Sequence, residues 1–136
     1  MRIDCITTSV GCLSSLDAQW IVRHMTRSGS EFQREVDGRA GDTPVALIRN
    51  KELRIACWVA THEWQGKQTI EGFTCEQVRR RGMARAAAAL LVAAGFLRTD
   101  RPTAVFSPDC VEIAKSIGCR NVSLYERSAD GQWVVV

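Results

Sequence analysis

The stretch CEQVRRRGMA, residues 75–84, joins a predicted strand to a predicted helix, and the rest of the chain is arranged around this junction. The strand covers Thr69–Cys75, and the helix runs from Gly82 to about Leu97. Arginines precede this helix, whereas the helix macrodipole favours acidic residues and polar N-caps there. Because the first backbone N–H groups of a helix have no partner within it, a bound phosphate would resolve this conflict. The alternative is a solvated arginine cluster with Gly82 as a loop residue.

Upstream of this junction, short β-rich runs separated by turn residues predict an antiparallel meander. The run Cys57–Ala60 is apolar at every position, as in a central strand covered on both faces. A short first strand over 2–8 and an amphipathic helix over 15–27 come earlier, and Glu31–Val36 is either a second helix or part of a loop. The predicted meander strands are Val45–Ile48, Leu53–Ala60 and Thr69–Cys75, and the apolar face of the helix over 15–27 is Leu16, Trp20, Ile21 and Met25.

Downstream of the junction, the period of the apolar residues predicts alternating helices and strands. A strand at Thr103–Phe106 should pair in parallel with residues 70–76 through a right-handed crossover. Ser107 then caps a last helix over Cys110–Ile117, and a hairpin joins residues 122–127 to 132–136. The predicted core face of the crossover helix is Met83, Ala86, Ala87, Leu90, Leu91, Ala94 and Leu97.

The order of these elements, β-α-(α)-β-β-β-α-β-α-β-β, predicts one α+β domain over residues 1–136. We expect a layered arrangement, with a mixed and mostly antiparallel sheet flanked by helices. The chain has 136 residues, 46% of them hydrophobic and 24% charged, as in average globular proteins. Neither a membrane span of ~18 apolar residues nor a signal sequence is evident, so we expect a cytoplasmic protein with no membrane association.

The charged residues and cysteines exclude further classes of protein. The net charge of +3 is too mild to indicate nucleic-acid binding, although Lys51, Lys67 and Lys115 are the only lysines among the 18 basic residues. The six cysteines have no C-x-x-C spacing, and the chain has only two histidines. We therefore expect reduced, mostly buried thiols and no metal site.

Residues 79–84 fit the Q/R-x-x-G-x-G/A signature of the GNAT superfamily of acetyl-CoA-dependent N-acetyltransferases. Glu76–Arg79 resembles the E-Q-V-R-G-x-G string of the histone-acetyltransferase branch, and Ala114, Ile117 and Gly118 resemble the A…L-G-F ending of the last helix in many members. The predicted order of elements is similar to the GNAT topology from end to end. The chain thus resembles a small single-domain GNAT protein.

The resemblance implies a site for acetyl-CoA, with no metal. The family's signature loop holds the pyrophosphate through backbone N–H groups, and the edge of the preceding strand pairs with the pantetheine amides. A splay between residues 70–76 and 103–106 would admit the thioester. The implied pyrophosphate residues are Arg79, Arg80, Arg81, Gly82, Met83 and Ala84, and the implied pantetheine residues are Gly72, Phe73, Thr74 and Val78.

The chain departs from the family where catalysis is concerned. Many members carry a tyrosine four residues before the glycine of the last helix, as general acid for the leaving thiolate, and Ala114 stands there instead. Arg80 replaces a common loop glycine, and Cys119 replaces the aromatic residue after the glycine. Gly66–Thr69, where the histone-acetylating branch has its glutamate base, contains no acid.

Other residues are therefore candidates for the proton transfers that amine acetylation requires. Glu71 is the best-placed base, and a solvent-facing strand residue is its alternative. His62 and Glu63 come next, with a hydrogen-bonded structural role as the alternative for His62. Ser107 is a candidate donor in place of the tyrosine, and Cys75 is expected to be a buried structural thiol.

Two functions remain open. The first is direct acetyl transfer from acetyl-CoA to a primary amine on a protein or small molecule. The second is a catalytically weak or inactive GNAT-like protein that binds acyl-CoA, a partner enzyme or both. A compact, arginine-rich chain of this kind would suit a phage-encoded modulator of a host protein. A homodimer is also expected, because Val134–Val136 would form an adhesive strand edge.

Overall fold

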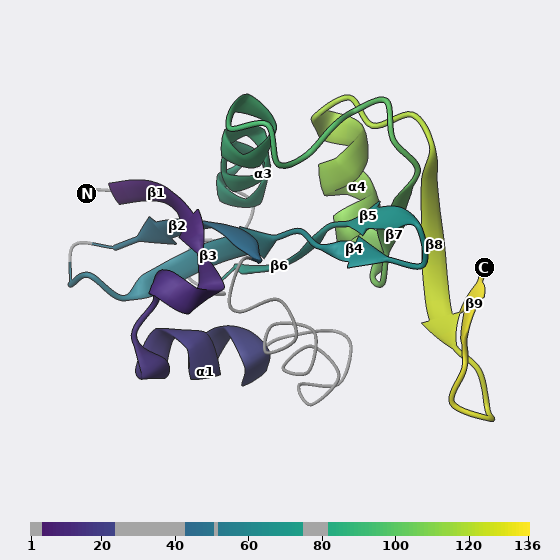
Figure 1. Ribbon diagram of the computed structural model, residues 1–136, viewed down its shortest axis with the longest axis horizontal. Coiled ribbons are helices and arrows are strands. Elements are labelled where there is room, and N and C mark those ends of the chain that lie inside the picture. The colour runs from purple at the N-terminus through teal and green to yellow at the C-terminus, as the bar shows by residue number, and fades with distance from the viewer. Residues whose placement is uncertain (1–3, 24–42, 51, 75–81) are drawn as a thin grey trace.

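The chain folds into two sheets that share one long hairpin (Figure 1). The computed structural model describes residues 4–23, 43–50, 52–74 and 82–136. The sheets have the orders β1-β2-β3-β6 and β4-β5-β7-β8-β9. The strands are β1 (Asp4–Ser9), β2 (Pro44–Arg49), β3 (Ile55–Ala60), β4 (Glu63–Trp64), β5 (Lys67–Thr69), β6 (Glu71–Thr74), β7 (Thr103–Val105), β8 (Val122–Arg127) and β9 (Trp133–Val135), and the helices are α1 (Ser15–Arg23), α3 (Met83–Ala93) and α4 (Pro108–Ser116).

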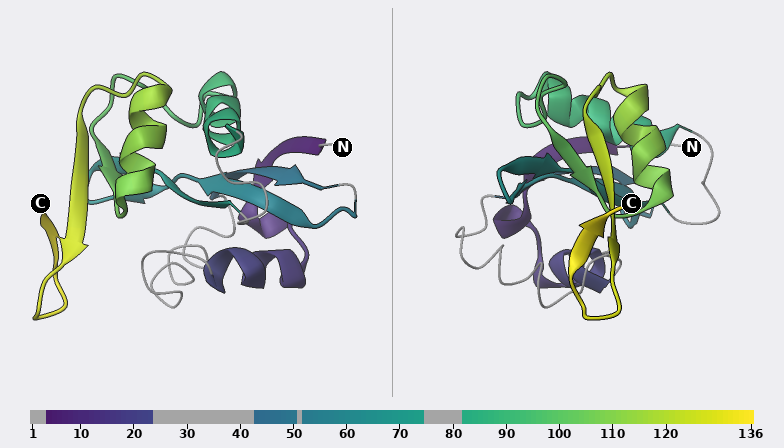
Figure 2. Two further views of the ribbon diagram at one scale, coloured as in Figure 1. Left: turned by 180° about the vertical axis from the view of Figure 1, so that it is seen from behind. Right: turned by 90° about the vertical axis from the view of Figure 1, so that its right-hand side faces the viewer.

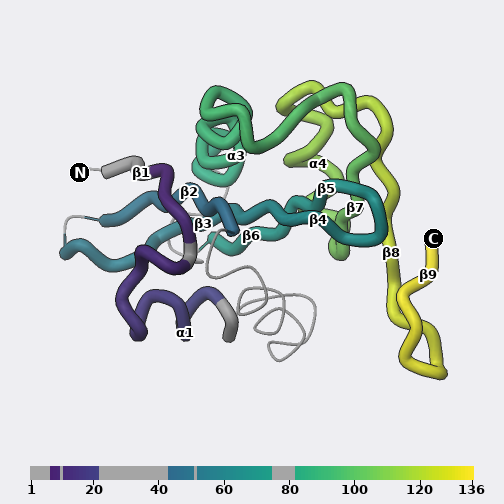
Figure 3. Tube along the Cα trace, viewed as in Figure 1, coloured from purple at the N-terminus to yellow at the C-terminus, as the bar shows by residue number. Residues whose placement is uncertain are grey.

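The α+β class is as predicted, and the described helices and strands follow the predicted order, with β4 and β5 as additional short strands within the meander. Figure 2 places α3 and α4 on one side of the sheets and α1 on the other. The ends of the trace, β1 and β9, lie at opposite ends of the molecule (Figure 3).

The first sheet is buried on both faces because β2 and β3 are apolar at successive positions. Their side chains alternate between two cores, as the period of a strand requires. Trp58 is fully buried in the core beside α1, as expected for a central strand. The face toward α3 carries Ala46, Ile48, Cys57 and Val59, and the face toward α1 carries Val45, Leu47, Trp58 and Ala60.

The two sheets divide at Ile70, within the predicted strand Thr69–Cys75. On one side of this residue, β5 pairs in parallel with β7, with Gln68 opposite Thr103. The Ile70 N–H still reaches the Ala104 carbonyl at 3.2 Å. On the other side, β6 pairs antiparallel with β3 and leaves β7. The parallel pairing predicted for residues 70–76 therefore extends only over their beginning, and the predicted splay is present.

The second sheet carries α4 on one face and a cluster of aromatic rings on the other. Trp64 packs edge-on against Phe106 and Tyr125, with ring centroids 5.1 and 4.9 Å away. Trp133 reaches Phe106 at 5.0 Å, and the Arg127 guanidinium lies 4.5 Å from the Trp133 ring. We call Trp64, Phe106, Tyr125 and Trp133 the aromatic cluster.

Two predicted helix faces need correction. Leu16 is 79% exposed and was wrongly placed in the core face of α1, whereas Ile21 is fully buried and Trp20 packs partly buried against the same core, as predicted. On α3, Ala88 is buried whereas Ala86 and Ala94 are exposed, because the buried face of the helix is rotated toward Ala88 relative to the predicted face.

The end of α3 also comes earlier than predicted. Gly95 adopts a left-handed conformation with φ of 83°, and its N–H and that of Phe96 bond back to the carbonyls of Val92 and Leu91. These two hydrogen bonds form a Schellman motif, which ends the helix before Leu97.

The C-terminal hairpin forms as predicted and leaves apolar side chains exposed. β9 pairs antiparallel with β8, and Val134, Val135 and Val136 are 46%, 60% and 70% exposed. None of the helices in the described ranges is long and apolar enough to cross a membrane. Among the same residues, no three His, Cys, Asp or Glu side chains are grouped to hold a metal ion.

Candidate functional site

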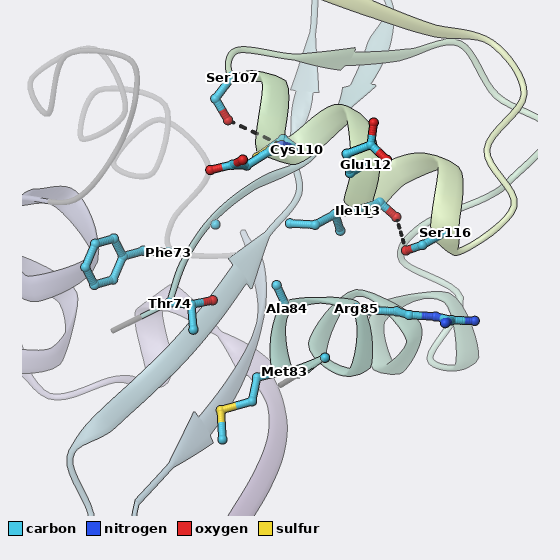
Figure 4. Close-up of a pocket in the computed structure, with 13 residues that line it drawn as sticks. Phe73, Thr74, Met83, Ala84, Arg85, Ser107, Cys110, Glu112, Ile113 and Ser116 are labelled. Carbon is cyan, nitrogen blue, oxygen red and sulfur yellow. Dashed lines mark hydrogen bonds between the residues drawn. The ribbon is translucent and has the colours of Figure 1, made fainter. Parts of the chain in front are cut away.

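A cavity of about 740 Å³ opens where the two sheets divide. Figure 4 shows it between α4 and the first turn of α3, with β6 along one side. β6 contributes Gly72–Thr74, and the start of α3 contributes Gly82–Arg85. The lining residues of α4 are Ser107, Asp109, Cys110, Glu112, Ile113 and Ser116. The volume falls within the range of small-molecule sites, roughly 300–1,000 Å³.

The start of α3 presents backbone N–H groups to this cavity. Its N-cap is Gly82, with φ of 74°, and no side chain of the described residues caps it. The first intrahelical bond runs from Ala86 N–H to the Gly82 carbonyl at 3.0 Å, so the N–H groups of residues 83–85 precede the helical ladder. The first turn contains no acid and carries Arg85 instead.

The start of α4 lines the same cavity but is conventionally capped. The Ser107 hydroxyl accepts a hydrogen bond from the Cys110 N–H at 3.4 Å, Pro108 begins the helix, and Asp109 lies in the first turn. The macrodipole of α4 is thus already compensated by its own cap and first turn, whereas no side chain of the described residues does the same for α3. An anion entering the cavity is therefore favoured at α3.

The strand β6 lies along the other side of the cavity, and among the described strands only β3 pairs with it. One edge of β6 is bonded to β3, and beyond Ile70 its other edge has left β7. The Phe73 ring points away from the cavity and packs edge-on against Trp20, with centroids 6.3 Å apart (Figure 4). Thr74 points into the space beside α3, where its hydroxyl contacts Cys57 Sγ at 3.3 Å. Phe73 can therefore serve a ligand only through its backbone.

Glu71 lies at the division of the sheets and is almost completely buried, with 2% of its surface exposed. It pairs with Ala60, so its side chain belongs to the face of the sheet that α1 covers. The alternative of a solvent-facing strand residue is therefore wrong. A carboxyl group in this position is close to the cavity but on the opposite face from α3 and α4.

His62 lies on the same face as Glu71, diagonally across the hairpin. Thr69 N–H donates to the His62 carbonyl at 3.0 Å, and the Thr69 hydroxyl lies 2.9 Å from His62 Nδ1. His62 is 5% exposed and outside the cavity lining. The structure thus gives His62 the hydrogen-bonded role that the sequence left open, and brings it near Glu71 without placing it at the cavity.

Glu63 is directed elsewhere. Its carboxylate forms a two-pronged ion pair with the Arg101 guanidinium, with one N–O distance of 2.9 Å. This hydrogen bond raises the pKa of Arg101 above its usual value. Glu63 is exposed and does not line the cavity, so it is committed to a surface ion pair.

The sequence did not single out Cys110, which the structure places in the cavity lining with 4% exposure. Burial raises the pKa of its thiol above 9.0, and the negative charge of Glu71 acts in the same direction. Hydrogen bonds from the Ser107 hydroxyl and the Gly72 backbone oppose the rise. One signal was present: Cys110 precedes Ala114 by one helical turn, on the same buried face of α4.

Part of the expected site lies outside the described residues, namely Cys75, Val78, Arg79, Arg80 and Arg81. Of the other expected cofactor residues, Gly72, Phe73, Thr74, Gly82, Met83 and Ala84 all line the one cavity. Met83 is 7% exposed and packs in the core, so its contribution to a ligand would be its backbone N–H. Ser107 also lines the cavity, whereas Glu71, His62 and Glu63 do not.

Comparison with known proteins gives little further information. No family model matches the chain, and no curated protein matches it. Among solved structures, the chain is similar to the crystal structure of "a putative phosphinothricin N-acetyltransferase", at 12% identity and a TM-score of 0.38, over 92% of this chain and 72% of the other. At this level of similarity, activity is inferred only from the geometry of the chain itself.

Proposed function

We propose that the protein is an acetyl-CoA-dependent N-acetyltransferase that acts on a primary amine. The observation that carries the proposal is the meeting of two complementary binding elements in one cavity. They are the start of α3, which no side chain of the described residues caps, and the edge of β6 that faces away from β3. The first favours a phosphate group, and the second favours an extended chain of amides. Coenzyme A joins a diphosphate to an amide-containing pantetheine arm, so it matches both elements.

The bound cofactor would lie along β6, with its diphosphate at Gly82, Met83 and Ala84. Backbone N–H groups at a helix start and the positive end of the dipole favour the diphosphate there. The pantetheine amides would pair with the edge of Gly72–Thr74, and the thioester would reach the division of the sheets at Ile70. Val78 and Arg79–Arg81 belong to the proposed cofactor site only through the resemblance to the family signature, because they lie outside the described residues.

The acceptor amine would approach from the face that α1 covers. Glu71 lies on that face at the division of the sheets, where a carboxylate can take the proton of the attacking amine. The amine nitrogen attacks the thioester carbonyl directly, in a ternary complex. Glu71 is thus the proposed base, and His62 shares its face without reaching the cavity.

The second candidate, a partner-binding protein without activity, is favoured by the exposed Val134–Val136 and by Ala114 in place of the family's tyrosine. Both features lie outside the start of α3, where the diphosphate is proposed to bind. This candidate therefore predicts cofactor binding without turnover, and a homodimer or a heterologous complex through β9.

Isothermal titration with acetyl-CoA tests the binding step. We expect saturable binding in the micromolar range and competition by coenzyme A. A Gly82→Asp variant should bind much more weakly, because it places a carboxylate beside the diphosphate, while a Gly131→Asp variant in the distant hairpin should not. Absence of heat and of any thermal shift at millimolar acetyl-CoA would refute the proposal.

Turnover is tested by release of free coenzyme A with hydroxylamine, a polyamine and a lysine-containing peptide as acceptors. The acetylated product is identified by mass spectrometry. Binding without any protein-dependent release would leave the cofactor site in place and favour the second candidate.

A further inference from the structure

We propose that Cys110 is the acid that protonates the coenzyme A thiolate when the thioester breaks. The inference rests on the proposed function, since it requires acetyl-CoA in the cavity. The sequence indicated Ser107 as the candidate proton donor and gave Cys110 no role in the site.

The first argument is the position of the thiol. Cys110 lies in the first turn of α4 and lines the cavity between that helix and β6. The Gly72 backbone and the Ser107 hydroxyl both form hydrogen bonds with its sulfur. It therefore spans the gap between the strand edge proposed for pantetheine and the helix facing it, where the thioester sulfur would lie.

The second argument is the protonation state. The charged groups that act on the thiol, Glu71 from β6 and Asp109 from its own helix, are both acidic, and burial acts in the same direction. Across the cavity, α3 contributes Arg85, which is exposed. The thiol is therefore protonated at neutral pH, which suits a donor and not a nucleophile, since only the thiolate attacks.

The third argument is the absence of a better donor around the cavity among the described residues. Tyr125 lies in the aromatic cluster on the opposite face, with Lys67 Nζ 5.9 Å from its ring. The Ser107 oxygen is occupied as the N-cap of α4, and a hydroxyl is a far weaker acid than a thiol.

The proposed step balances as follows. The amine nitrogen forms a bond to the thioester carbonyl carbon, and Glu71 takes the proton that the nitrogen loses. The carbon–sulfur bond breaks with its electron pair on sulfur, which takes the proton of Cys110 Sγ. Glu71 then gives its proton to solvent, and the Cys110 thiolate takes one proton from solvent, which restores both groups. The net change moves one proton from nitrogen to sulfur, and no other reactant is consumed.

The proximity of the two sulfurs is tested with the disulfide of coenzyme A, which needs no acceptor. Attack of the Cys110 thiolate at alkaline pH would form a Cys110–coenzyme A disulfide and release one coenzyme A thiolate. Peptide mapping should find the adduct on Cys110 and not on Cys119, a buried thiol outside the cavity lining, and acetyl-CoA should prevent it. Adduct on Cys119 alone would overturn the placement.

The acid role is tested by hydroxylamine-dependent release of coenzyme A from acetyl-CoA. Cys110→Ala should lower the rate by about 100-fold, within the usual range for general acids, with acetyl-CoA affinity unchanged by titration. Cys110→Ser should be impaired nearly as much, because it restores the packing but not the acidity, and Cys119→Ala should be unaffected. Wild-type rates in Cys110→Ser, or no protein-dependent release from bound acetyl-CoA, would overturn the role. If the wild-type protein does not bind acetyl-CoA, that result would instead refute the proposed function.

Discussion

Reversing the charge of Arg85 should make the free protein more stable and the cofactor complex weaker. Arg85 lies in the first turn of α3, at a helix end with no acid in that turn and no side-chain cap among the described residues. An arginine there opposes the macrodipole, and a glutamate at the third helical position complements it. The substitution Arg85→Glu therefore removes an unfavourable interaction and adds a favourable one.

The substitution should change the stability of the protein and its affinity for acetyl-CoA in opposite directions. Each of the two changes contributes about 0.3–1 kcal/mol to helix stability, so Arg85→Glu should stabilise the protein by about 1 kcal/mol. For the proposed diphosphate, a charge pair about 8 Å apart is worth about 2 kcal/mol at an effective dielectric constant of about 20. Salt at physiological strength leaves roughly a third of that. Because the charge is reversed and not merely removed, the loss is about twice that, and affinity should fall roughly 10-fold.

Urea unfolding measures the first effect, and isothermal titration with acetyl-CoA measures the second. The matched control is Lys115→Glu, which changes the net charge equally but in the last turn of α4. A glutamate at that end opposes the macrodipole, so the control should lose stability and keep its affinity. The proposed anion site at the start of α3 would be refuted if the Arg85→Glu variant were less stable than the wild type. It would also be refuted if the variant bound acetyl-CoA as tightly as the wild type.

Three further predictions follow from close contacts. A Cβ on Gly72 would lie 2.8 Å from the Trp58 carbonyl oxygen, so Gly72→Ala should cost about 1–3 kcal/mol in urea unfolding; unchanged stability would contradict this contact. Ser107→Ala removes the cap of α4 and should lower stability by about 1 kcal/mol, whereas Ser107→Asp should retain most of it. Because the pKa of Cys110 is raised, its alkylation by iodoacetamide should be slow at neutral pH and become faster only in alkaline solution, and acetyl-CoA should protect it. Rapid alkylation at pH 7, mapped to Cys110, would show that the thiol is not held neutral.

Local sequence patterns were sufficient to predict the elements that depend only on neighbouring residues or that are buried on both faces. The run 55–60 is apolar at every position and is buried at every position, so its central place required no knowledge of its neighbours. The cap at Ser107 was equally local, because the bond joins residues three apart. The turn before β9 belongs to the same class, with Gly131 at φ of 85°.

The features that escaped prediction depend on contacts distant in the sequence. No glycine or proline marks the division at Ile70, which arises because the two halves of one strand pair with different partners, β7 and β3. Alternation placed Glu71 on a strand but did not say that α1 and its neighbours would bury it. Cys110 became a candidate only when the division brought β6 close to the start of α4. The cavity thus follows from tertiary structure, whereas the proposed phosphate site at its α3 end was suggested by local sequence.

The aromatic cluster gives the second sheet its own optical signal. The four tryptophans divide evenly, with Trp20 and Trp58 in the core beside α1 and Trp64 and Trp133 in the aromatic cluster. Fluorescence emission from variants that retain only one pair would follow each half of the molecule separately. If the shared hairpin makes the halves cooperative, both signals will change at the same denaturant concentration.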